Sequence, residues 1–166
     1  MDKKVDIIKD ADGKSIAVIN NLRFKGRRSV DWNVVEDCLK EYIGQCIEIM
    51  ETSDVVYIGA DFPDEFAHSK DTKELRGANM YAKANSSSII REMIEIATNK
   101  SFAENYTQKH STNAKFGWYR YDTRFAIPVY NDAGELDRYN VFKARILVRH
   151  AKDGKLYLYD ILKYKS

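Results

Sequence analysis

The chain has 166 residues, of which 44% are hydrophobic and 31% are charged, and this composition is typical of one folded domain rather than a disordered or fibrous protein. A chain of this length buries enough surface to fold without disulfides or a structural metal. No stretch approaches the ~20 apolar residues of a membrane helix, and residues 1–8 lack the apolar region of a signal peptide. We therefore expect a cytoplasmic protein with no membrane partner.

Charge is distributed unevenly along the chain. Residues 1–100 carry 15 Lys and Arg against 18 Asp and Glu, a net charge of −3, whereas residues 101–166 carry 12 against 7, a net charge of +5. Aromatic residues are also concentrated after residue 100. An anionic partner is therefore expected to bind the C-terminal part.

The two cysteines, Cys38 and Cys46, match neither a zinc site nor a disulfide framework, and we expect both to be small buried thiols. No metal-binding spacing, P-loop or dinucleotide fingerprint is present in the sequence. We therefore expect no metal and no cofactor.

The first half of the chain predicts two hairpins and a helix. β-type residues on both sides of Asp12-Gly13 predict an N-terminal hairpin, because this dipeptide supplies the positive φ that a tight turn requires. Apolar spacing predicts a helix over residues 31–42, capped by Ser29 or Asp31. Two short β-type runs at 47–50 and 55–58 predict a second hairpin, whereas residues 59–77 show no clear period and predict an irregular segment.

The second half predicts helices followed by a sheet. Helical spacing extends over residues 78–99, with Ser86-Ser87-Ser88 as a break or cap, and a short helix is expected over residues 102–109. Three strands are predicted at the end of the chain, over residues 117–130, 138–149 and 155–163.

The expected fold class is therefore α+β, a C-terminal antiparallel sheet of three or more strands packed by two or three helices, with an N-terminal β-hairpin. We expect a single domain over residues 1–166. Residues 1–54 would form the N-terminal hairpin and helix region, and residues 55–166 the functional region.

Side chains alternate between the two faces of a strand, so each of the last three strands can be divided by odd and even positions. In every strand one set is apolar and the other holds the cations or tyrosines. If the apolar sets share the core side, the other side is a basic and aromatic surface formed by Arg120, Arg124, Lys143, Arg145, Arg149, Tyr157 and Tyr159. Such a face is either an ordinary solvated sheet surface or a phosphate site with stacking tyrosines. Asp160 falls on the apolar set of its strand, and we expect its carboxylate to be paired inside.

Histidines are the natural proton carriers at neutral pH, and His110 is the best placed because it precedes the basic strand. His150 is expected to be an edge residue. A second polar group, formed by Glu65, His68 and Ser69, lies in the irregular segment and is either a constellation of its own or a solvated loop.

The string KHSTNAKFGWYRYDTRFAIPV around His110, followed by YNVFKARILVRHAKDGKLYLYDILKYK, resembles the nuclease-like domains of the barnase, EndoU, colicin and RelE class that phages and other mobile elements of bacteria carry. The segment YIGADFPDEFAHSKDTKELRG also resembles part of this group, so that the resemblance covers most of residues 55–165.

This resemblance implies a metal-independent endoribonuclease, acting as a toxin or mobile-element effector, with RNA as partner and a cognate protein inhibitor or host target as a further one. His110 would be the general acid or base and Arg120 and Arg124 the phosphate clamp, while Tyr157 or Tyr159 would stack on a base or donate a proton. Further nucleic-acid contacts are expected from Lys109, Lys115, Lys143, Arg145 and Arg149.

Two other functions remain open from the sequence. One is a nucleic-acid-binding module that keeps the basic face without catalysis. The other is a protein-interaction or inhibitor domain whose acidic segment, residues 61–74, is the working surface.

Overall fold

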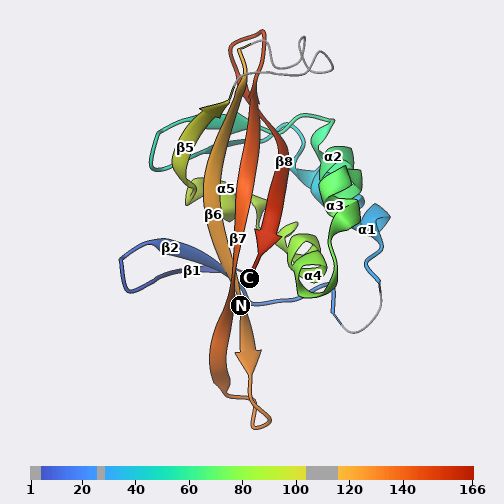
Figure 1. The fold of residues 1–166 in the computed structure, drawn as a ribbon, viewed down its shortest axis with the longest axis vertical. Coiled ribbons are helices and arrows are strands. Elements are labelled where there is room, and N and C mark those ends of the chain that lie inside the picture. Colours follow the sequence, from blue (N-terminus) through green and yellow to red (C-terminus); the bar gives the residue numbers. More distant parts are fainter. Residues whose placement is uncertain (1–4, 26–28, 104–115) are drawn as a thin grey trace.

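The computed structural model describes residues 5–25, 29–103 and 116–166. In these ranges the chain forms one large sheet with short helices around it (Figure 1). The strands are β1 (Val5–Lys9), β2 (Ser15–Ile19), β3 (Cys46–Glu48), β4 (Val55–Tyr57), β5 (Thr98–Ala103), β6 (Trp118–Tyr130), β7 (Leu136–His150) and β8 (Leu156–Lys165).

The sheet is mixed, and its strand order is β1-β2-β6-β7-β8-β4-β3, with β5 pairing with β6 outside this path. β2 runs parallel to β6, and β4 runs parallel to β8. All other described pairs are antiparallel. The strands curl into a half-barrel, whose centre is formed by the three long strands β6, β7 and β8 (Figure 1).

Short helices cover the concave side and the β8 side of the sheet (Figure 1). They are α1 (Trp32–Leu39), a 3₁₀ turn (Lys40–Tyr42), α2 (Phe62–His68), α3 (Lys70–Glu74), α4 (Gly77–Ser86) and α5 (Ile90–Glu95). Asp31 caps α1 by accepting a hydrogen bond from the backbone N–H of Asn33. Within the described ranges no helix has the length and apolar character needed to cross a membrane.

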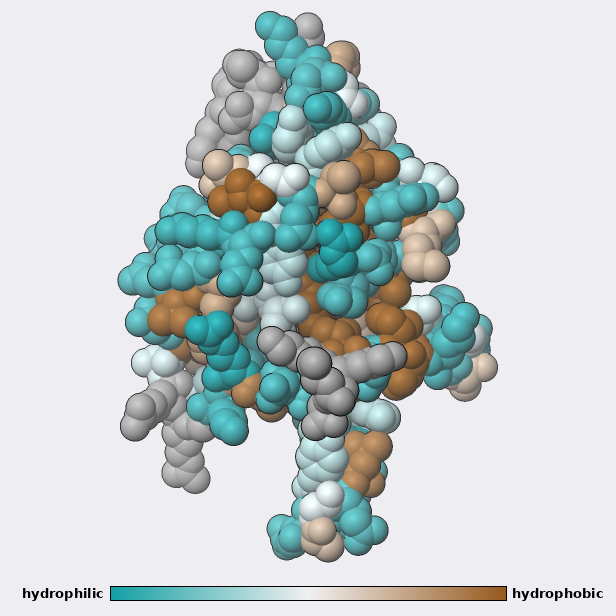
Figure 2. Space-filling view, turned by 180° about the vertical axis from the view of Figure 1, so that it is seen from behind, coloured by the Kyte–Doolittle hydropathy of each residue, from teal (hydrophilic) through white to brown (hydrophobic). Residues whose placement is uncertain are grey.

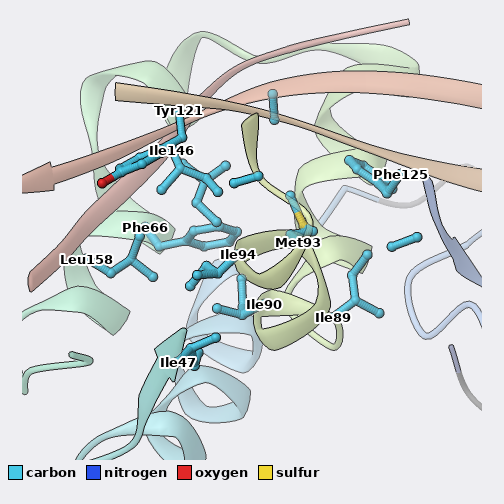
Figure 3. Close-up of a cluster of buried hydrophobic side chains, with 14 of the residues drawn as sticks. Ile47, Phe66, Ile89, Ile90, Met93, Ile94, Tyr121, Phe125, Ile146 and Leu158 are labelled. Carbon is cyan, nitrogen blue, oxygen red and sulfur yellow. The ribbon is translucent and has the colours of Figure 1, made fainter. Parts of the chain in front are cut away.

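The core lies between the sheet and α5. Figure 3 shows Tyr121 and Ile146 on the side of the strands that faces the helices, in one cluster with Met93 and Ile94 of α5 and Phe66 of α2. All five of these side chains are fully buried. Burial of a large apolar side chain stabilises a fold by about 1.5–3 kcal/mol, so this contact fixes which face of β6 and β7 points inward.

The predicted fold class is wrong in its architecture. The chain does not form a small antiparallel sheet packed by helices with a separate N-terminal hairpin, because β1 and β2 continue the main sheet through the parallel pairing of β2 with β6. β2 and β4 each pair in parallel with a strand that is distant in sequence. The alternation of side chains within one strand does not indicate which other strand it will pair with.

Several local expectations are also corrected. Residues 59–77, predicted to be irregular, contain α2 and α3. Thr98–Ala103 is a strand where the end of one helix and the start of another were expected. Cys46 is exposed and Cys38 half-buried, so the expectation of two buried thiols is wrong.

The far ends of β6 and β7 project from the body as a two-stranded ribbon (Figures 1 and 2). Its side chains from residue 130 to residue 140 are exposed. The ribbon contains the acidic residues Asp132, Glu135 and Asp137 as well as the exposed side chains of Tyr130, Leu136 and Tyr139.

Candidate phosphate-binding site

The convex face of the central sheet holds the basic surface that the sequence predicts for β6 and β7. The register pairs Asp122 with Arg145 and Arg124 with Lys143, while the neighbouring pairs Tyr121–Ile146 and Phe125–Phe142 are buried. Because opposite residues in an antiparallel ladder share a face, the charged pairs point away from the core. The odd–even prediction is therefore confirmed for β6 and β7.

A cavity of about 620 Å³, which we call the hairpin pocket, opens on this face. Its floor is formed by the middle of β6 and β7 and the end of β8, and its walls by the β1–β2 turn and the start of β5. Its lining residues are Asp10, Asp12, Gly13, Lys14, Ser15, Ile96, Thr98, Asn99, Asp122, Thr123, Arg124, Lys143, Ala144, Arg145 and Lys163.

The lining of the hairpin pocket is net positive, because it holds five Lys and Arg residues against three Asp. Arg124 is bound to Asp10 across 2.7 Å, and this contact lowers the pKa of the Asp10 carboxyl. Arg145 lies 3.8 Å from Asp122. Within the described residues, Lys143 and Lys163 have no acid within ion-pair distance, so both ammonium groups are available to an anion.

A second cluster, which we call the aromatic end, lies where β6 begins and β7 ends. Arg149 stacks 4.4 Å from the Tyr157 ring and lies 3.6 Å from Asp61 at the start of α2. Its side chain is only 14% exposed. The Tyr157 hydroxyl donates a hydrogen bond of 2.6 Å to Asp153, and this bond is the main reason that the pKa of Tyr157 is raised.

Tyr159 is also in the aromatic end, but it is partly buried. Its ring lies edge-on to Trp118, with 5.1 Å between the ring centroids. Burial and the charge of Glu65, to which it is hydrogen-bonded, raise the pKa of the Tyr159 hydroxyl. The hydroxyl is thus a poor proton donor at neutral pH, and the predicted role of Tyr159 as an acid is weakened.

The predicted catalytic residues therefore do not form one cluster in the described structure. Arg124 lines the hairpin pocket, Arg120 is exposed on the same face, and Tyr157 and Tyr159 belong to the aromatic end. Trp118 and Arg124 are six residues apart along β6, which corresponds to roughly 20 Å. His110, Lys109 and Lys115 lie outside the described residues.

The predicted secondary polar group does not assemble either. Glu65 binds Tyr159, Ser69 caps α3 by accepting from the Thr72 N–H, and His68 pairs with Glu36 of α1 at 2.8 Å. These three residues thus have three different partners.

The sequence did not indicate a group of three side chains with metal-ligand atoms between α1 and α2. Glu36, Asp64 and His68 offer ligand atoms that all lie within 4.8 Å of one another. Asp64 and His68 are four residues apart on α2, a spacing that places both on one helix face. A hydrogen bond of 2.8 Å between His68 Nε2 and Glu36 Oε1 accounts for the closest contact without a metal.

Sequence reasoning also missed Asp10, Lys14, Asn99 and Lys163 of the hairpin pocket. They come from three strands or turns far apart in the chain, and no sequence spacing could have related them. Asp160 is paired inside as expected, with its oxygen 3.2 Å from the buried Lys83 ammonium.

Comparisons with family models, with curated proteins and with solved structures find no match to this chain.

Proposed function

We propose that the protein is a metal-independent endoribonuclease of the kind carried by phages or mobile elements, and that it binds the RNA backbone at the hairpin pocket. The observation that carries the proposal is the net positive lining of this pocket, with Lys143 and Lys163 unpaired among the described residues. Arg124 and Arg145 add guanidinium groups that can bind phosphate with two parallel hydrogen bonds.

The proposed reaction needs a base, a cation and an acid. A base takes the proton of the 2′-hydroxyl, and the oxygen attacks the adjacent phosphorus while the bond to the 5′-oxygen breaks. An acid protonates the leaving 5′-oxygen, so that the products are a 2′,3′-cyclic phosphate and a 5′-hydroxyl. His110 is the proposed proton carrier, and the pocket cations stabilise the charge that develops on the phosphate oxygens.

The experiment is incubation of the purified protein with mixed RNA in EDTA. We expect cleavage that survives EDTA, yields 2′,3′-cyclic ends, and is lost in both His110→Ala and Arg124→Ala, since Arg124 lines the hairpin pocket. His150→Ala and His68→Ala are matched controls, since each removes an imidazole from another part of the chain, and both should retain cleavage. Cleavage that requires Mg²⁺, or that persists in His110→Ala, would contradict the proposal.

A catalytically inactive nucleic-acid-binding module is the second candidate. The separation of Arg124 from Tyr157 and Tyr159 favours it, because those predicted catalytic groups do not converge on one phosphate. Intact RNA that binds with a steep dependence on salt would support this module over the enzyme, since phosphate contacts release counterions.

A further inference from the structure

Two residues other than glycine that line the hairpin pocket have a left-handed backbone. Among the described residues other than glycine, positive φ occurs at Ser53, Asn99 and Lys163, and the last two line the pocket. This conformation is uncommon for a residue with a Cβ atom and costs of order 1–3 kcal/mol when the surroundings impose it. Asn tolerates it well, but Lys does not.

Lys163 occupies an irregularity of β8. Lys143 pairs with Lys165 and Arg145 pairs with Leu162, so β8 has an extra residue opposite this part of β7. Bulges of this kind re-aim side chains and often use Gly at the left-handed position. In β8 the bulge leaves Tyr164 buried in the core and Lys163 exposed in the pocket.

A chain of polar contacts that leads to the buried Lys83 holds this strained residue. The backbone N–H of Lys163, at φ 59°, donates to Asp71 Oδ1 at 3.3 Å. The other oxygen of Asp71 lies 3.2 Å from the ammonium of Lys83, which is fully buried and also binds Asp160 at 3.2 Å. Burying an ammonium group between two carboxylates costs desolvation free energy. Through Asp71, this buried group is joined to the backbone of Lys163.

We propose that Lys163 binds a phosphate group of the substrate in the hairpin pocket, and that Asp71, held by Lys83, is a positioning residue that keeps the Lys163 backbone left-handed. A glycine would relieve the strain at this bulge, but it would remove the cation from the pocket. The inference rests on the proposed function for the identity of the ligand as RNA, and on the pocket geometry for the site itself.

The first test measures binding of a 5′-labelled oligouridylate by fluorescence anisotropy in EDTA over a series of salt concentrations. Lys163→Ala should weaken binding roughly fivefold to tenfold and reduce the magnitude of the salt slope by about 0.7, the value for one phosphate contact on a single strand. Lys163→Arg should retain most of the affinity. Lys165→Ala is the matched control, because it removes an exposed lysine of the same strand that does not line the pocket.

The second test examines the positioning role. Asp71→Ala, which removes the acceptor of the Lys163 N–H, should reduce the salt slope in the same way as Lys163→Ala, and the double variant should bind no more weakly than Lys163→Ala alone. A general loss of folding would instead add to the effect of Lys163→Ala. Additive losses would therefore overturn the positioning role, and equal affinity of Lys163→Ala and Lys165→Ala would overturn the site.

Failure of the proposed function can be distinguished from failure of this inference. If the wild-type protein binds no RNA, inorganic phosphate is titrated while the backbone amides are followed by NMR. Shifts at Lys163 and Asn99 that vanish in Lys163→Ala but persist in Lys165→Ala would support the site. Shifts that are the same in both variants, or no shifts, would overturn it.

Discussion

The hairpin pocket and the aromatic end lie on the same sheet, and each contains part of the basic and aromatic face that the sequence predicted. In the hairpin pocket the β1–β2 turn adds a wall and leaves Lys143 and Lys163 without acidic partners among the described residues. In the aromatic end the start of α2 brings Asp61 to Arg149, whose guanidinium is already stacked on Tyr157.

The comparison shows that the elements packed over a cationic sheet face determine how well its cations can bind an anion. A guanidinium with a carboxylate and a ring as neighbours has much of its binding capacity occupied, whereas an unpaired ammonium in an open cavity is available to phosphate. The pocket is thus the better phosphate site, although the aromatic end holds most of the tyrosines that the sequence singled out.

The largest effect should follow from Lys83→Met, which removes the buried cation between Asp71 and Asp160. Asp160 is completely buried, and loss of its partner leaves an uncompensated carboxylate, so we expect the free energy of unfolding to fall by about 3–5 kcal/mol. Urea unfolding followed by circular dichroism measures it. Lys155→Ala at the aromatic end is the control and should change stability by less than about 0.5 kcal/mol, because Lys155 is exposed. Similar losses of unfolding free energy in Lys83→Met and Lys155→Ala would contradict this prediction.

An intermediate effect should separate the two clusters in RNA binding. Lys143→Ala is expected to weaken oligouridylate binding about tenfold, because Lys143 lines the pocket and has no acidic partner among the described residues, and Arg149→Ala less than about threefold, because Arg149 is engaged by Asp61 and Tyr157. Anisotropy titrations at one salt concentration measure both values. Arg138→Ala on the projecting ribbon serves as a control and should leave binding unchanged. A greater loss in Arg149→Ala would move the phosphate site to the aromatic end.

The smallest expected effect is a pH dependence of stability that arises from Asp160 and its ion pair with Lys83. Burial raises the pKa of Asp160 from 3.8 to about 6, although Lys83 opposes the rise. The folded state therefore holds this proton more tightly than the unfolded state, and the stability it contributes is present below pH 3.8 and is lost as pH rises through about 6. Asp160→Asn removes this titration. Relative to the variant, the wild type should lose stability between about pH 4 and pH 6 in urea unfolding.

The opposite sign applies to the carboxyl groups whose pKa is lowered. Asp10, bound to Arg124, and Asp153, bound to Tyr157, favour the folded state above their unfolded pKa and lose this contribution as pH falls. For this reason the Asp160 effect is measured as a difference between wild type and variant. A difference that is constant over this pH range would show that Asp160 does not titrate there.

Much of the local structure could be predicted from the sequence. Asp31 caps the first helix as expected, and of the three predicted serines Ser86 ends α4 while Ser87 and Ser88 lie between α4 and α5. Asp12-Gly13 lies between two antiparallel strands, and the odd–even division of β6 and β7 identified the buried set correctly. These features depend on neighbours within a few residues, where side-chain alternation and turn chemistry act directly.

The amino-acid sequence by itself determined the three long C-terminal strands, the charge of their convex face and the internal pairing of Asp160. Only the tertiary structure decided that β2 and β4 join the sheet in parallel, that α2 brings acids to Arg149, and that Asn99 and Lys163 meet across one cavity. The reason is that strand edges, bulges and buried ion pairs are formed between segments far apart in the chain, and their partners are selected by the packing of the whole core rather than by local pattern.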